Sequence, residues 1–142
     1  MIYNNCVKKI EKLHAKNLIL AILINSKVKN MKIYHNPRCS KSRQGLAILK
    51  DAKVDFEIIE YLKTPPTEKE IKDILTKLQI EPIDLVRKNE AIWKENYKGK
   101  ELSNEQIIKA MAENPKLIER PIVIHNNKAV LGRPPENISS LI

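Results

Sequence analysis

The chain has 142 residues, which suits one domain with its own hydrophobic core and leaves no room for a second domain of ordinary size. Hydrophobic residues make up 42% of the chain and charged residues 30%, a balance that excludes global disorder. The formal net charge is +9, but beyond residue 30 basic and acidic residues are interleaved and aromatic residues are few, so the composition argues against a nucleic-acid-binding protein.

The first 30 residues differ from the rest of the chain. They hold six Lys and one acidic residue, Glu11, and so contribute +5 of the net charge. Their apolar stretch, 18–24, is shorter than the ~20 residues that cross a bilayer, and no small-residue cleavage site follows it. We expect residues 1–30 to be an N-terminal extension of a domain that spans 31–142. It would be either an amphipathic helix packed on that domain or a flexible segment upstream of a true start at Met31.

The domain is expected to begin with a strand, a turn and a helix. The apolar run 32–34 predicts a short strand that ends near His35, and residues 36–39 form a turn. The helical pattern after the turn has three apolar positions, Leu46, Ile48 and Leu49. Cys39 is therefore expected where a strand gives way to a helix.

A second strand and helix complete a βαβ unit. Residues 56–61 are rich in β-forming side chains, and Pro65-Pro66 ends the run. Thr67 and Glu70 have the spacing of a capping box, which predicts a helix start. We expect that helix to bury Ile71, Ile74, Leu75 and Leu78. Because such crossovers are right-handed and join parallel strands, the two strands should be parallel.

A helical region is inserted before the remaining strands. It opens at Pro82 and continues through a polar stretch that contains Trp93 and Tyr97. Ser103 and Gln106 form a second capping box, before a helix expected to end near Asn114. The apolar side of that helix holds Ile107, Ile108 and Met111.

A β-hairpin and a short terminal helix end the domain. Residues 121–125 and 128–131 predict two strands joined by the turn Asn126-Asn127. A short terminal helix is expected to hold Ile138, Leu141 and Ile142. The order of elements places the chain in the α/β class, with a four-stranded mixed sheet flanked by helices.

Cys39 is the residue with the most distinctive chemical setting. A thiol at the start of a helix is close to unpaired backbone N–H groups and to the positive end of the helix dipole, both of which favour the thiolate. Arg38 and Arg43 add positive charge nearby. A thiolate of lower basicity is also a slower nucleophile, so a catalytic site additionally needs a pocket that holds an electrophile over the sulfur.

Three further arginines are candidates for that pocket. Arg87, Arg120 and Arg133 each stand beside a turn or the end of an element, in a chain whose cations are mostly Lys. The planar guanidinium group binds oxyanions through two parallel hydrogen bonds. From spacing alone the same arginines could equally form surface salt bridges. His35 and Cys39 offer no four-ligand zinc pattern, so no metal is expected.

These residues lie in blocks that resemble the glutaredoxin-dependent arsenate reductase family. The likeness runs from Met31 almost to Ile142 and rests on four blocks in the family's order, 35–43, 85–89, 119–123 and 131–134. It implies a thioredoxin-like fold with an inserted helical region. It also implies the reduction of arsenate to arsenite, with glutathione and glutaredoxin as the reductants.

The resemblance also implies a role for each site residue. Cys39 would be the nucleophile that bonds arsenic, His35 would tune the thiol, and Ser42 would hydrogen-bond the thiolate. The oxyanion would be bound by Arg87, Arg120 and Arg133. The Arg120-Pro121 peptide would be cis. The loop departs from the family pattern at Ser40-Lys41, where a Gly-containing pair is usual, which puts the affinity in question but not the type of reaction.

The sequence also indicates where the electrons come from. Ser42 stands where a Cys-x-x-Cys motif would hold its second cysteine, so the loop has no resolving thiol and an outside thiol has to release Cys39. Cys6 is the alternative resolving thiol, although an N-terminal extension is a poor place for it. With two cysteines in all, the chain suits a reducing compartment, and we expect it in the cytoplasm.

A second function remains open at this point. Spx-type transcription regulators are related to the arsenate reductases, share their fold and act by binding RNA polymerase. The three arginines and the one-cysteine loop favour the reductase, because a polymerase-binding surface does not need an oxyanion clamp. An unrelated thiol transferase is a third possibility.

Overall fold

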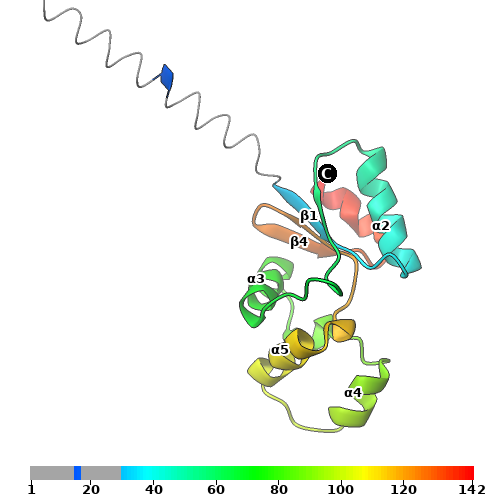
Figure 1. Cartoon of the computed structure of the whole chain (residues 1–142), viewed down its shortest axis with the longest axis vertical. Coiled ribbons are helices and arrows are strands. Elements are labelled where there is room, and N and C mark those ends of the chain that lie inside the picture. Colours follow the sequence, from blue (N-terminus) through cyan, green and yellow to red (C-terminus); the bar gives the residue numbers. More distant parts are fainter. Residues whose placement is uncertain (1–14, 17–29) are drawn as a thin grey trace, which may run out of the picture.

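A four-stranded mixed sheet forms the centre of the domain. The computed structural model describes residues 15–16 and 30–142, and Figure 1 shows their arrangement. The predictions for Cys6 and for most of the extension lie outside the described residues. The four strands are β1 (Met31–Tyr34), β2 (Glu57–Ile59), β3 (Ile122–His125) and β4 (Lys128–Leu131). Their order across the sheet is β2-β1-β3-β4.

The pairing of the strands confirms the predicted topology. β1 and β2 are parallel, with Ile33 opposite Ile58, as the βαβ interpretation requires. β1 is antiparallel to β3, and β3 is antiparallel to β4, so the sheet is mixed. Asn126 opens the hairpin turn with a φ of 55°, in the left-handed region that Asn tolerates.

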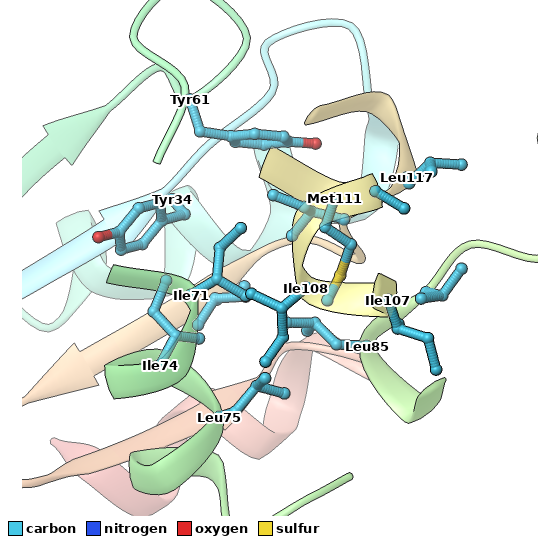
Figure 2. Close-up of a cluster of buried hydrophobic side chains, with 14 of the residues drawn as sticks. Tyr34, Tyr61, Ile71, Ile74, Leu75, Leu85, Ile107, Ile108, Met111 and Leu117 are labelled. Carbon is cyan, nitrogen blue, oxygen red and sulfur yellow. The ribbon is translucent and has the colours of Figure 1, made fainter. Parts of the chain in front are cut away.

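Two hydrophobic clusters cover the two faces of the sheet. In β3, Val123 points to one face while Ile122 and Ile124 point to the other, as the period of two in a strand dictates. The face of Val123 packs against α2 (Ser40–Asp51) and the 3-10 helix η3 (Pro135–Leu141). The opposite face packs against α3 (Glu68–Leu78) and α5 (Asn104–Glu113), the larger cluster drawn in Figure 2.

Both predicted capping boxes are present. The Thr67 side chain accepts a hydrogen bond from the Glu70 N–H, and the Glu70 carboxylate accepts one from the Thr67 N–H at 2.7 Å. Ser103 and Gln106 make the same reciprocal pair at the start of α5. These bonds satisfy backbone donors that have no partner inside the helix, which explains where both helices begin.

The inserted helical region lies between α3 and β3. Besides α5, it contains three short elements: the 3-10 helix η1 (Pro82–Leu85), α4 (Ala91–Asn96) and the 3-10 helix η2 (Pro115–Leu117). A single antiparallel bridge, Val86 to Ile118, joins its two ends. Next to the bridge the Arg87 N–H donates to the Leu117 carbonyl at 2.7 Å. The backbone before α4 and the backbone before β3 therefore run side by side.

Two details differ from the sequence-based expectations. β2 is shorter than the predicted 56–61, because the carbonyl of Glu60 accepts bonds from the N–H groups of Lys63 and Thr64 and so starts a turn. The terminal segment is a 3-10 helix that holds and buries Ile138 and Leu141 but ends at Leu141, so Ile142, expected in the helix, lies just after it and is 50% exposed. Within residues 15–16 and 30–142, no helix is long and apolar enough to cross a membrane.

Candidate active site

Cys39 is the N-cap residue of α2. Its backbone is extended, with φ −93° and ψ 123°, and its carbonyl accepts the hydrogen bond from the Arg43 N–H that begins the helix. The thiol itself makes no capping bond, and the residue is partly exposed. Cys39 thus precedes the first-turn N–H groups of the helix and is partly accessible to solvent, as a reactive cysteine must be.

The turn before Cys39 is fixed by its own polar groups. The Cys39 N–H donates to the Asn36 carbonyl at 3.0 Å, and the Asn36 side-chain oxygen accepts from the Arg38 N–H at 3.0 Å. The Arg43 guanidinium reaches back to the Pro37 carbonyl, also at 3.0 Å. Arg38 therefore lies in the turn, and Arg43, in the first turn of α2, reaches back to it through its guanidinium group.

His35 and Ser42 form a buried pair under this turn. Ser42 Oγ lies 2.7 Å from Nδ1 of His35 and accepts a hydrogen bond from the Asn36 N–H at 2.9 Å. Burial lowers the pKa of His35, a shift that the Glu60 carboxylate and the Ser42 contact oppose. Within the described part of the chain, no hydrogen bond joins either side chain to the Cys39 sulfur. The predicted contact between Ser42 and the thiolate stays a prediction.

Arg87 is held by several groups at once. Its Nη1 pairs with Glu90 and lies 3.5 Å from the Lys116 carbonyl, while its Nε is 4.0 Å from Oε2 of Glu119. The side chain is 24% exposed. The Val86–Ile118 bridge places Arg87 and Glu119 on adjacent backbone segments, which explains how residues 32 positions apart come into contact.

Glu119 brings two of the predicted arginines together. Its Oε2 lies 3.3 Å from Nη1 of Arg133 and 4.0 Å from Nε of Arg87. Spacing alone gave no role to Glu119, although it directly precedes Arg120 in one of the recognised blocks. Its position could not be foreseen, because it depends on the pairing of two distant segments.

Arg120 has a different environment from the other two arginines. It is 8% exposed, and its Nε and Nη1 are buried without a hydrogen-bond partner among the described residues. A buried guanidinium with unpaired donors is costly, since each lost hydrogen bond to a charged group weighs about 1.5–3 kcal/mol. Such a group is well suited to bind an anion.

The proline after Arg120 connects these arginines to α2. A Cβ atom added at Gly45, in the second turn of α2, would lie 2.9 Å from Pro121 Cγ, and one added at Gly132 would lie 2.7 Å from it. The Gly132 N–H also donates to the Pro121 carbonyl at 2.8 Å. Pro121 and Gly132 are therefore in close contact beside α2. Arg120 directly precedes Pro121, and Arg133 directly follows Gly132. The predicted cis bond before Pro121 is confirmed, and the Arg133-Pro134 bond is also cis.

Tyr61 lies within electrostatic range of both Cys39 and Arg87. The residue is 1% exposed, and burial raises the pKa of its hydroxyl. Arg87 opposes that shift, while Cys39, Glu119 and Glu90 add to it, so all four groups lie within electrostatic range of one phenol. Figure 2 shows the Tyr61 ring against the large cluster, with its hydroxyl and that of Tyr34 pointing to opposite sides. Sequence reasoning placed Tyr61 only in a β-rich run and missed this position.

Cys39, which is partly exposed, and Arg87 both lie within electrostatic range of Tyr61, and the residues next to Arg120 and Arg133 pack beside α2. Guanidinium groups near a nucleophilic sulfur can bind a tetrahedral oxyanion and present its central atom to that sulfur. Among the described residues, no group of three His, Cys, Asp or Glu side chains is placed to hold a metal ion.

The comparisons with known proteins agree with one another. The sequence model of the ArsC family matches residues 34–141. The uncharacterized protein YfgD of Escherichia coli K12 is 47% identical over 116 residues, which cover 80% of this chain and 98% of that protein. An arsenate reductase of Neisseria meningitidis serogroup A is 42% identical over 114 residues, which cover 79% of this chain and 97% of the relative.

A solved structure extends the likeness to the fold. The arsenate reductase from Vibrio cholerae superposes with a TM-score of 0.76 at 43% identity, over 79% of this chain and 97% of that one. The thioredoxin-like fold implied by the four blocks is therefore confirmed.

Proposed function

The chain belongs to the ArsC family, and on that premise we propose that it reduces arsenate to arsenite with Cys39 as the nucleophile. The observation that carries the proposal is the buried Arg120, whose Nε and Nη1 have no partner among the described residues. A guanidinium in that state favours an anionic ligand. In the sequence Arg120 follows Glu119, whose Oε2 lies 3.3 Å from Nη1 of Arg133 and 4.0 Å from Nε of Arg87.

The chemistry needs two thiols for each arsenate. The Cys39 thiolate bonds to arsenic and displaces one oxygen, which leaves as water after taking up protons. A second thiol then attacks the Cys39 sulfur, so that a disulfide forms and the electron pair of the sulfur–arsenic bond passes to arsenic. Arsenic thereby goes from the pentavalent to the trivalent state and departs as arsenite. The arginines would hold the oxygens and balance their charge throughout.

The second thiol comes from outside the loop. Ser42, at the position of a resolving cysteine, is fully buried and bonded to His35 and Asn36. We assign the role to glutathione, with glutaredoxin then cleaving the mixed disulfide on Cys39. No tightly bound cofactor is needed, because both electrons come from thiols. A reductant of this kind is available in the cytoplasm, where we place the protein.

The test is an arsenate-dependent assay of NADPH oxidation, coupled through glutathione reductase, glutathione and glutaredoxin. The expected result is turnover that requires arsenate and stops when glutaredoxin is left out. Turnover with thioredoxin alone would correct the donor but keep the reaction. No turnover with any thiol donor, together with binding to purified RNA polymerase, would favour the Spx-type regulator instead.

A further inference from the structure

The outer edge of β2 is open. Among the described strands β2 pairs only with β1, so it forms one edge of the sheet. The Ile59 carbonyl faces β1, since it accepts the His35 N–H at 2.8 Å. Successive residues of a strand turn their backbone groups to opposite sides, so the N–H and the carbonyl of Ile58 face outward. The Ile58 side chain is itself 45% exposed. An edge of this kind can pair with an added strand.

A cavity of about 270 Å³ lies beside this edge. Its lining includes the whole of β2, Pro65 and Pro66 in the segment that follows, and Tyr34 of β1. Tyr34 belongs to the cluster on the α3 face of the sheet and stands opposite Ile59. Because side chains alternate along a strand, Glu57 and Ile59 share that face, and Ile58 points to the other.

Carboxylates give the cavity a negative charge. Three of its lining residues are acidic, Glu57, Glu60 and Glu70, and none of them is basic. Two cations lie nearby: Lys63 is paired with Glu60, and Lys32 is within electrostatic range of Glu70. Three carboxylates against two cations leave an excess of negative charge, and Glu57 is exposed at the start of the strand. The cavity therefore favours a cationic group.

Tyr34 supplies an independent indication of a ligand. The residue is 7% exposed, and its hydroxyl points away from the other labelled side chains of the cluster (Figure 2). No hydrogen bond joins this hydroxyl to a described residue. Burial raises the pKa of Tyr34 to about 12, and the carboxylates of Glu70, Asp73 and Glu57 add to the shift. The phenol is thus neutral, and its oxygen can accept a hydrogen bond from an ammonium or guanidinium group.

We propose that the edge of β2 binds an extended segment of a partner protein in which apolar and basic residues alternate. The segment would add to the sheet as a strand, paired with the outward N–H and carbonyl of Ile58. One Lys or Arg side chain would enter the cavity and meet Glu57 and the Tyr34 hydroxyl. An apolar neighbour would cover Ile58 on the other face. The inference goes beyond the proposed reaction, because it uses neither Cys39 nor the arginines.

The ligand side of the contact gives the first test. The probe is the peptide acetyl-Thr-Val-Arg-Val-Thr-amide, and its control has citrulline in place of Arg, which keeps the shape but removes the charge. Each peptide is titrated into the full chain and followed by the amide signals in NMR spectra. We expect the Arg peptide to bind at least about 5-fold more tightly, with the largest signal changes along β2. Equal affinities, changes confined to other elements, or no binding of either peptide would overturn the inference.

The protein side gives the second test. Glu57→Gln should reduce the preference for the Arg peptide over the citrulline peptide to less than about 2-fold. Glu68→Gln is the matched control, because it removes a carboxylate of α3 that does not line the cavity, and the preference should persist. Tyr34→Phe removes only the hydroxyl and should weaken the Arg peptide more than the citrulline peptide. A preference that Glu57→Gln and Tyr34→Phe leave unchanged would contradict the inference.

The pairing of backbones is tested separately. Ile58→Pro removes an outward N–H that the sheet does not use, so the variant should fold, as circular dichroism can check, and should bind the Arg peptide at least about 10-fold more weakly. If the variant does not fold, N-methylated peptides answer the same question. Methylation of the alternate residues that face β2 should abolish binding, and methylation of the other set should not. Equal effects of the two sets, or full binding by folded Ile58→Pro, would contradict strand addition. Arsenate turnover is no readout in these tests, so this inference and the proposed reaction can fail independently.

Discussion

Ser42 Oγ and His35 Nδ1 lie 2.7 Å apart beneath the turn that carries Cys39, and both residues are buried. The hydroxyl also accepts the Asn36 N–H, so one atom ties the end of β1 to the first turn of α2. Its loss would leave a ring nitrogen and a backbone N–H without partners in a buried place. The position of the thiol therefore depends on a contact that the thiol does not make.

Ser42→Ala should lower the free energy of unfolding by about 1–3 kcal/mol, because it leaves buried polar groups unpaired. Urea denaturation measures the change. Ser40→Ala is the matched control, since Ser40 is in the same turn but exposed, and it should have an effect within about 0.5 kcal/mol. Similar losses in both variants would mean that the helix start, and not the buried pair, accounts for the effect.

His35 should make the domain sensitive to mild acid. Its pKa is lowered by burial, so the unfolded chain, in which His titrates near ~6.5, binds the proton more readily than the folded one. Stability is then complete above that value and falls as the pH drops toward the folded-state pKa. Urea denaturation at several pH values between 7.5 and 5 should show this fall, and His35→Gln should reduce its slope. An unchanged slope in the variant would assign the acid sensitivity to other groups.

Cys39→Ser should abolish turnover of arsenate, because the hydroxyl is a far weaker nucleophile than a thiolate at neutral pH. Cys6→Ser should retain full activity in the same coupled assay, since the resolving thiol is expected to come from outside the chain. Equal loss in the two variants would instead indicate an internal disulfide between Cys39 and Cys6.

Arg120→Lys keeps the positive charge but loses the planar guanidinium group, which can make two parallel hydrogen bonds to an oxyanion. We expect the kcat/KM for arsenate to fall at least about 10-fold, which corresponds to the loss of one charged hydrogen bond. Arg133→Lys should act in the same direction. Circular dichroism checks that each variant is folded. Unaltered kinetics in both folded variants would assign these arginines to structure and not to substrate binding.

Gly45→Ala should disturb the site from a distance. The new Cβ would lie 2.7 Å from Ile138 Cδ1 and 2.9 Å from Pro121 Cγ, so the segment that carries Arg120 has to move. Although Ala favours a helix, the overpacking should cost about 1–3 kcal/mol of stability and lower the activity. Thermal unfolding and the coupled assay measure the two effects.

A double variant separates the two contacts of that Cβ. Ile138→Val removes Cδ1 and should restore part of the stability of Gly45→Ala. The activity should stay low, because the contact with Pro121 persists. Recovery of full activity in Gly45→Ala/Ile138→Val would contradict the proposed link between Pro121 and Arg120.

Local sequence signals predicted most of the fold. Capping boxes and tight turns depend on residues a few positions apart, so a short segment of sequence determines their geometry. This holds for the capping boxes at Thr67 and Ser103 and for the Asn126-Asn127 turn. The end of β2 was missed because a turn interrupts the apolar run there. The exposure of Ile142 was missed because the apolar pattern does not show which residues of the terminal segment pack against the domain.

The site was only partly predictable for a related reason. The thiol and the three arginines could be recognised by residue type and by the family blocks. Glu119 and Tyr61 could not, because their roles arise when segments far apart in the chain are brought together. The Val86–Ile118 bridge is one such long-range contact, and spacing along the sequence does not reveal it.

That bridge has a consequence for how the protein tolerates change. The bridge fixes the backbone on both sides of the inserted region. The positions of Arg87 and Glu119, which are next to the bridge, therefore depend on this pairing and not on the far end of the insertion. The tip around Gly99, which has open space about it, is thus a natural place for length variation, affinity tags or reporter peptides. Relatives could differ widely there in size and still keep the same arginine geometry.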